Sequence, residues 1–208
     1  DNALRIDFST LDIQPVPLVL RDSGDTRRAR IPESASGWRL VTLDSGDSRA
    51  LAASGYNERR AECARACELL GVDSLREADS RHLDALPPVL ARRVRHVVEE
   101  NARVSATVVA LRAGEIERVG ALLDAAHASL RDLYECSTAA VEVAVARLKR
   151  AGAVGARIVG GGFGGHVLGL FPPGASPPSD AREARPSAGA QLLDRPGAPA
   201  HGHPGAGA

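Results

Sequence analysis

The spacing of hydrophobic residues changes twice along the chain, from a period of two to a helical period and back. Residues 3–8 alternate apolar and polar side chains, and an extended apolar run with two prolines covers 11–18. This alternation predicts two short strands, the second at a sheet edge because proline cannot donate to a ladder. Residues 21–37 are polar and predict a surface connection. A third strand is expected over 38–43, followed by a turn.

From Ser54 onward the apolar residues recur every three or four positions, which predicts helices. A turn at Ser54 and Gly55 precedes the first helix, and Gly71 ends it. Two prolines open a longer helix that Gly114 ends, as a C-terminal glycine commonly does. The expected helices cover 57–70, 88–113, 116–133 and 138–150. One face of the longest is expected to hold Leu90, Val94, Val97, Val98, Asn101, Val104, Val108 and Leu111.

The strand pattern then returns around a run of glycines. Residues 156–159 lead into Gly160-Gly161-Gly162-Phe163-Gly164-Gly165, and 166–171 lead out of it. A last strand is expected within 183–193, and the Pro-, Gly- and Ala-rich tail 194–208 is expected to be disordered. Strands followed by helices and then strands again indicate an α+β fold rather than an alternating α/β fold.

Composition limits the classes of function. The chain has 208 residues, 44% of them hydrophobic, which is enough for a buried core. Its 26 basic and 26 acidic residues cancel, which argues against nucleic acid or an anionic membrane as a partner. No apolar run is long enough to span a membrane. Three cysteines suit a reducing, cytoplasmic compartment. Methionine is absent and the chain opens in a strand pattern, so we expect it to be part of a longer protein.

The glycine loop 160–165 is the strongest candidate for chemistry. It satisfies G-x-G-x-x-G formally, but a dinucleotide site requires that turn to open a helix, and here a strand follows. A Walker A motif is excluded because no Gly-Lys-Ser/Thr follows. Two interpretations stay open. Exposed backbone amides in the loop could hold anionic oxygens, or the glycines could serve tight packing alone.

Two other groups of reactive residues carry less weight. Cys63 and Cys67 have a spacing that could present two thiolates to a metal, but no paired second half follows, and buried thiols are favoured. His127, Ser129 and Asp132 match a catalytic triad in composition only, because neighbouring helix positions point in different directions. The sequence therefore predicts no metal site and no catalytic residue.

Several segments together resemble the galactokinase family of GHMP-superfamily sugar kinases. Tyr56 opens a helix, and taken alone this segment indicates only a helix start. In order and at family-like spacing, however, the matching segments are 3–8 (ALRIDF), 16–18 (VPL), 51–63 (LAASGYNERRAEC), 98–104 (VEENARV), 127–135 (HASLRDLYE) and 155–165 (GARIVGGGFGG). The resemblance extends from residue 3 to about residue 171.

The resemblance implies a fold and an activity. It implies the end of an N-terminal GHMP domain over 1–43 and a ferredoxin-like C-terminal domain over 44–193. The implied reaction transfers the γ-phosphoryl group of MgATP to the C1 hydroxyl of galactose, in an enzyme that is a monomer when complete. Tyr56 matches the tyrosine that contacts the sugar. Gly160 to Gly165, including Phe163, match the third GHMP motif near the phosphates.

The chain also departs from the family pattern. The sugar-binding first motif, the Gly-Leu-Ser-Ser-Ser-Ala phosphate loop and the Met-Asp-Gln segment with the catalytic base are all absent from it. Val159, His166 and Ala139 replace a threonine, a cysteine and a proline of the family. We therefore expect the chain alone to be inactive. The alternatives are a catalytically dead sugar-binding or interaction module, a gene remnant, and a sister kinase for N-acetylgalactosamine or arabinose.

Overall fold

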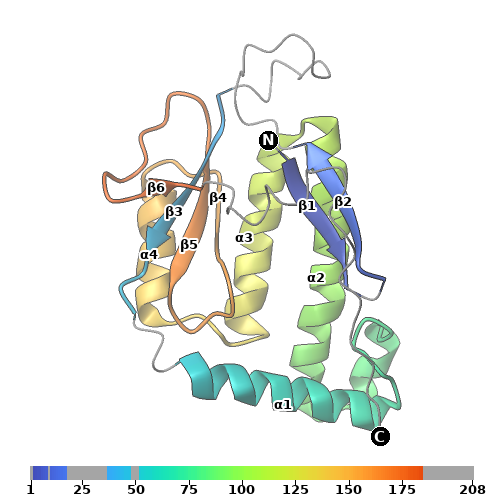
Figure 1. Cartoon of the computed structure of the whole chain (residues 1–208). Helices are drawn as coiled ribbons and strands as arrows, with labels where there is room; N and C mark the ends of the chain where they lie inside the picture. Colours follow the sequence, from blue (N-terminus) through green and yellow to red (C-terminus); the bar gives the residue numbers. More distant parts are fainter. Residues whose placement is uncertain (1, 9, 18–36, 48–51, 185–208) are drawn as a thin grey trace, which may run out of the picture.

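Two separate antiparallel sheets organise the strands. The computed structural model describes residues 2–8, 10–17, 37–47 and 52–184. Strands β1 (Asn2–Asp7) and β2 (Asp12–Pro17) pair only with each other among the described residues. This hairpin lies beside the helices and apart from the larger sheet (Figure 1). The two strands predicted at the start of the chain are confirmed.

The larger sheet has four strands in the order β4-β5-β3-β6. It contains β3 (Arg39–Asp44), β4 (Gly155–Ile158), β5 (His166–Phe171) and the short β6 (Arg182–Glu183). β3 pairs antiparallel with β5 along its whole length, so the sheet joins residues from both ends of the chain. The strand predicted over 38–43 thus shares a sheet with the glycine-loop hairpin. The α+β class is confirmed.

In the described part of the chain, four helices and one short 3-10 helix connect the strands. They are α1 (Ala52–Leu70), η2 (Ser80–Ala85), α2 (Pro88–Ala113), α3 (Ile116–Asp132) and α4 (Ala139–Arg150). The prediction of a turn at Ser54 and Gly55 was wrong, because α1 already begins at Ala52. Gly55 is needed for packing instead: a Cβ there would lie 2.5 Å from the Phe163 ring. The 3-10 helix was not predicted.

The main core lies between the four-stranded sheet and α4. Alternate residues of β3 and β5 face it, and α4 contributes three buried side chains; the set includes Val41, Leu43, Val167, Phe171, Val141, Ala144 and Leu148. Helix α3 runs along the edge strand β4 (Figure 1). Their backbones meet at two glycines, since a Cβ on Gly155 would lie 2.1 Å from the carbonyl oxygen of Gly120. Thus α3 approaches the sheet more closely than side chains would allow.

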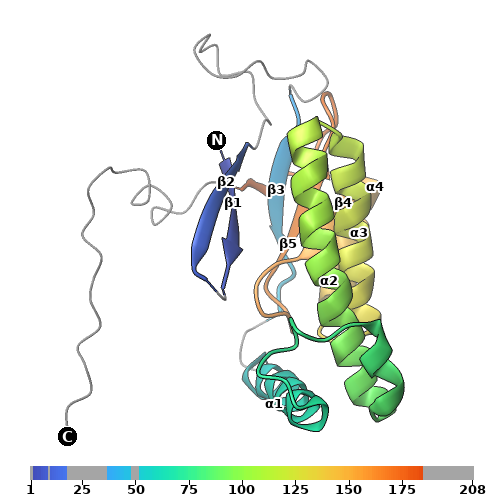
Figure 2. The same cartoon turned by 90° about the vertical axis from the view of Figure 1, so that its right-hand side faces the viewer.

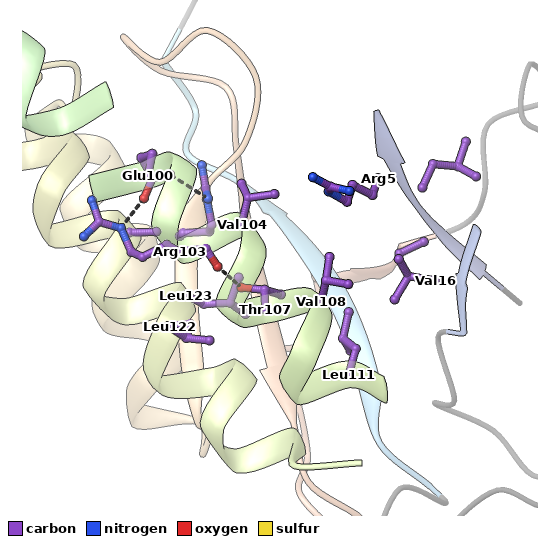
Figure 3. A pocket seen from close by; sticks show the side chains of 14 residues that line it. Arg5, Val16, Glu100, Arg103, Val104, Thr107, Val108, Leu111, Leu122 and Leu123 are labelled. Atoms are coloured by element: carbon purple, nitrogen blue, oxygen red, sulfur yellow. Dashed lines mark hydrogen bonds and ion pairs between the residues drawn. The ribbon is translucent and has the colours of Figure 1, made fainter. Parts of the chain in front are cut away.

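The apolar face predicted for α2 is buried at one end and open at the other. Leu90 and Val94 are buried in a cluster with α1 and η2, whereas Asn101 and Val104 are exposed. Beyond Val98 this face points toward the β1–β2 hairpin instead of a core. Its residues Val104, Val108 and Leu111 line a cavity closed on the other side by the hairpin (Figure 3). Sequence periodicity does not distinguish a core from such a partly open cavity.

Some expectations fall outside the described residues. The connection over 21–37 lies almost entirely in 18–36, and the tail 194–208 lies in 185–208. Of the strand expected within 183–193, only Glu183, the last residue of β6, is described as strand. Within the described part of the chain, none of the helices has the length and apolar character needed to cross a membrane. In the view turned by 90°, the helices α2, α3 and α4 lie next to one another (Figure 2).

Candidate functional site at the glycine loop

The loop between β4 and β5 adopts a conformation that ordinary side chains disfavour. Gly160, Gly162, Gly164 and Gly165 all have positive φ angles, between 80° and 119°. Phe163 also has a positive φ, 60°, which is uncommon for a residue with a side chain. The loop is closed by a hydrogen bond of 3.0 Å from the Val159 amide to the His166 carbonyl. The glycine run is therefore required by backbone geometry.

Residues from outside the hairpin hold the loop in place. The Phe163 amide donates a hydrogen bond of 2.7 Å to the carbonyl of Cys136, in the segment between α3 and α4. A Cβ at Gly162 would lie 2.7 Å from the Cβ of Cys136. On the other side, a Cβ at Gly164 would lie 2.8 Å from the Cβ of Asp47. The loop is thus packed between the β3–α1 connection and the α3–α4 connection.

Helix α1 brings Tyr56 to the same loop. A Cβ at Gly161 would lie 3.3 Å from Cδ2 of the Tyr56 ring, so the ring rests against this glycine. The side chain of Tyr56 is 47% exposed and therefore not a core residue. Phe163 of the loop packs in turn against Gly55 at the start of α1. The structure thus brings together the two sequence-predicted site elements, which are separated by about a hundred residues.

The loop presents backbone rather than side chains. Among the residues that the structure describes, its Phe163 amide is the only one between 160 and 165 that donates to a backbone carbonyl. Gly160 and Gly165 have open space where a side chain would be. A glycine-rich turn with unpaired amides can approach and bind anionic oxygens. Gly162 and Gly164 are needed for packing, while Gly160 and Gly165 leave the backbone accessible. Binding of anionic oxygens at the accessible glycines stays a prediction.

These features agree with the comparison to known families. The family described as "GHMP kinases C terminal" matches residues 107–191, a range that includes α3, α4 and the glycine loop. Residues 107–191 thus match the GHMP-kinase C-terminal family. The resemblance to galactokinases noted in the sequence is also confirmed. The galactokinase of Thermotoga neapolitana is 42% identical over 176 residues, covering 84% of this chain and 46% of that protein.

Other relatives give the same result. The galactokinase of Thermosipho africanus is 42% identical over 170 residues, covering 81% of this chain and 44% of that protein. Among solved structures, the galactokinase of Lactococcus lactis complexed with galactose is 33% identical with a TM-score of 0.68, covering 82% of this chain and 42% of that structure. The chain thus spans about half the length of the curated relatives that it matches, and it corresponds to their C-terminal portion.

The other reactive residues of this GHMP-kinase domain are engaged separately. His127 Nε2 lies 3.0 Å from Glu142, the Ser129 hydroxyl lies 2.8 Å from Nδ1 of His96, and Asp132 binds Arg131. The triad-like set therefore has three different partners, which confirms that it is no triad. No group of three or more potential metal ligands occurs among the described residues. Burial raises the pKa of the Cys136 thiol to about 11. Below that pH this cysteine acts as a neutral packing residue beneath Gly162.

Sequence reasoning missed the residues that hold the loop. Cys136 gave no signal, because a lone buried cysteine next to a helix has no recognisable pattern. Thr138 was visible as a helix start, and its hydroxyl indeed accepts a hydrogen bond from the Val141 amide. The same hydroxyl also donates to the carboxylate of Asp47, linking the start of α4 to the segment that touches Gly164. That second contact spans 91 residues of sequence, so no local pattern could predict it.

Proposed function

We propose that this chain supplies sugar-contacting and phosphate-facing groups of an enzyme that transfers the γ-phosphoryl group of ATP to the C1 hydroxyl of galactose. The observation that supports it is the contact between the exposed Tyr56 ring and Gly161 of the glycine loop. Phosphoryl transfer depends on holding the acceptor and the phosphate at adjacent positions. A sugar-binding side chain beside an anion-binding loop provides that arrangement.

On the sugar side, Tyr56 is the proposed contact. Its exposed phenol can hydrogen-bond a sugar hydroxyl, and its ring can lie against the apolar face of a pyranose. The galactokinase of Lactococcus lactis, which is known as a complex with galactose, shares the fold of this chain at 33% identity. Together these observations favour galactose over the sister sugars.

On the phosphate side, Gly160 to Gly165 are the proposed contact. The positive φ angles and open space at Gly160 and Gly165 let the backbone come close to a ligand. Such a loop suits the phosphate chain of ATP, which supplies the transferred group when bound. The loop's role is to bind and orient anionic oxygens. No side chain in it could donate or accept a proton.

Mg²⁺ and a catalytic base do not fit the described residues. The carboxylates near the loop are engaged: Asp47 accepts a hydrogen bond from Thr138, and the described residues contain no cluster of ligands suited to a metal. We therefore assign no catalytic and no metal-binding role to this chain. In this proposal those groups belong to a preceding domain, to which the β1–β2 hairpin within residues 1–43 also belongs.

A hybrid enzyme tests the proposal. The 208-residue chain is joined to the N-terminal portion of the Thermotoga neapolitana galactokinase in place of the matching region, and galactose-dependent ATP consumption is measured. We expect activity from the hybrid and none from the chain alone. A hybrid that melts cooperatively yet turns over no galactose would favour a dead sugar-binding module. A preference for N-acetylgalactosamine or arabinose would indicate a sister kinase.

A further inference from the structure

A buried arginine on α2 connects three segments close to the glycine loop. Arg93 is only 1% exposed, and each of its three guanidinium nitrogens donates a hydrogen bond. Nε donates to the Glu62 carboxylate of α1 at 2.6 Å, and Nη2 donates to the Glu135 carboxylate at 2.7 Å. Nη1 donates to the carbonyl of Leu133 at 2.5 Å. Arg93 therefore joins α1 to the segment 133–138 between α3 and α4.

Two further arginines complete this cluster. Arg59 of α1, also buried, lies 3.0 Å from Glu62 and 3.6 Å from Glu135. Arg92 lies 2.9 Å from the other carboxylate oxygen of Glu135. Replacing buried ion pairs by apolar side chains is often neutral or stabilising. The cluster is thus better explained by the relative position it imposes on these segments than by the stability it adds.

The relative position that the ion-pair cluster imposes is important because the two halves of α1 pack differently. The C-terminal half packs into an apolar cluster with α2 and η2 through Cys63, Ala66, Cys67 and Leu70. The described part of the N-terminal half exposes most of its side chains, including Tyr56 and Asn57. Figure 1 shows this end of α1 reaching past the base of α2 toward the β4–β5 connection. The ion pairs lie between these two halves.

On the side away from α1, the ion-pair cluster leads directly to the glycine loop through the segment 133–138. Glu135 has a φ of 55°, a left-handed conformation that is unfavourable for a glutamate unless other contacts maintain it. The next residue, Cys136, accepts the hydrogen bond from the Phe163 amide and packs under Gly162. Helix α1, the ion pairs of Arg93 and the segment 133–136 therefore link Tyr56 to the glycine loop.

We propose that Arg93 is a positioning residue, which sets the separation between Tyr56 and the glycine loop without touching a substrate. Its importance for activity rests on the proposed function, but its effect on geometry does not. Arginine suits this task because its planar guanidinium directs several donors in fixed directions. A lysine would place one charge at the same depth but could not hold three acceptors in the same orientation.

The test uses the isotopically labelled 208-residue chain, without ligands, and the variant Arg93→Met. NMR reports the contact between the Tyr56 ring and the Gly161 α-protons, and hydrogen exchange reports the Phe163 amide. We expect the contact to disappear and the Phe163 amide to exchange at least about tenfold faster, with little change in the buried amides of α4. The matched control is Arg103→Met, on the same helix and paired with Glu99 and Glu100, which should change neither readout.

Two results would overturn the proposal. One is a folded Arg93→Met protein that keeps the contact between Tyr56 and Gly161. The other is a uniform rise in exchange across all segments, which would make Arg93 a general stabilising residue. If Arg93→Met does not fold, Glu62→Gln replaces it, with the same selective loss expected and the same two results against it.

A second readout separates this proposal from the proposed function. In the hybrid enzyme, Arg93→Lys should raise the KM for galactose several-fold and leave the KM for ATP nearly unchanged. Equal changes in both constants would contradict the positioning role. An unsubstituted hybrid without activity would contradict the proposed function instead, while the NMR result on the chain itself would still decide the role of Arg93.

Discussion

The two hairpins of this chain share a pairing pattern and differ in burial. In the β1–β2 hairpin Ile6 lies opposite Ile13, and in the β4–β5 hairpin Ile158 lies opposite Val167. The first pair is exposed, 39% for Ile6 and 40% for Ile13, whereas the second pair is buried almost completely. Helix α4 and strand β3 cover the second hairpin, and the described residues place no comparable layer over the first.

The difference shows that strand pairing alone does not make a hairpin stable. An isolated two-stranded hairpin is marginal in water, and a covering layer is needed for independent stability. The hairpin with that layer is the one that carries the glycine loop. The other hairpin pairs with no further strand of the described residues and has apolar side chains on its outer face. These are features that promote association with further strands. Stability is therefore concentrated where the candidate site lies.

Matched isoleucine substitutions should give the largest difference between the hairpins. Ile158→Ala removes a fully buried side chain from a packed core and should lower the free energy of unfolding by about 2–5 kcal/mol. Ile6→Ala, at an exposed position, should change it by less than about 1 kcal/mol. Urea denaturation of both variants measures the two values. Similar losses would show that the first hairpin is part of the same cooperative core.

Two alanine substitutions, one in the glycine loop and one in the connection after β3, separate packing from backbone strain. Gly162→Ala places a Cβ against Cys136 at a positive φ, so we expect a loss of about 2–4 kcal/mol. Gly46→Ala has nearly the same φ, 82°, but open space around it, and should cost about 1 kcal/mol. Thermal or urea unfolding gives both values. Equal losses would mean that the contact with Cys136 contributes nothing.

Mild acid should weaken the part of the molecule that supports the second hairpin. Burial lowers the pKa of His96 to about 4, below its usual value of 6.5, so the unfolded chain binds a proton more readily than the folded one. The contribution of His96 to stability is then fully present well above pH 6.5, and it is lost as the pH drops toward 4, by up to about 3 kcal/mol. Urea midpoints at several pH values measure this slope. His96→Gln should flatten it, and an unchanged slope in that variant would assign it to other groups.

The smallest expected effect concerns the sugar contact. In the hybrid enzyme, Tyr56→Phe removes one neutral hydrogen bond, worth about 0.5–1.5 kcal/mol, so the KM for galactose should rise several-fold. The KM for ATP should stay nearly constant, since the phenol faces the sugar in this proposal. A lower melting temperature with equal changes for both substrates would make Tyr56 a packing residue.

Local patterns predicted most of the fold because the segments with strand or helix periodicity are long and clearly separated. Proline and glycine marked the bounds of α2 correctly, as at Gly114, which has a left-handed φ of 72°. Gly55 was misread as a turn because its function is contact with a residue a hundred positions away, which local sequence cannot show. The exposed face of α2 at Val104 was missed because an apolar residue facing a cavity resembles one facing a core.

The sequence named two parts of the candidate site, but it did not predict the contacts that hold them together. The glycine loop was identified from its own pattern and Tyr56 through the resemblance to a family, and the structure places them in contact. The buried cluster around Arg93 has no sequence signature, since arginine and glutamate on a helix normally face solvent. Contacts that join distant segments through buried charges become visible only in the fold.

Hydrogen exchange on the 208-residue chain tests the central comparison most directly, because one experiment reports both hairpins. The account predicts that the amides of β4 and β5, including Val167, and the Val159 amide that closes the glycine loop exchange only through global unfolding. The amides of β1 and β2, including those of Ile6 and Ile13, should exchange orders of magnitude faster through local opening. Equal protection of the two hairpins would contradict the claim that the layer over the site-bearing hairpin makes it the more stable of the two.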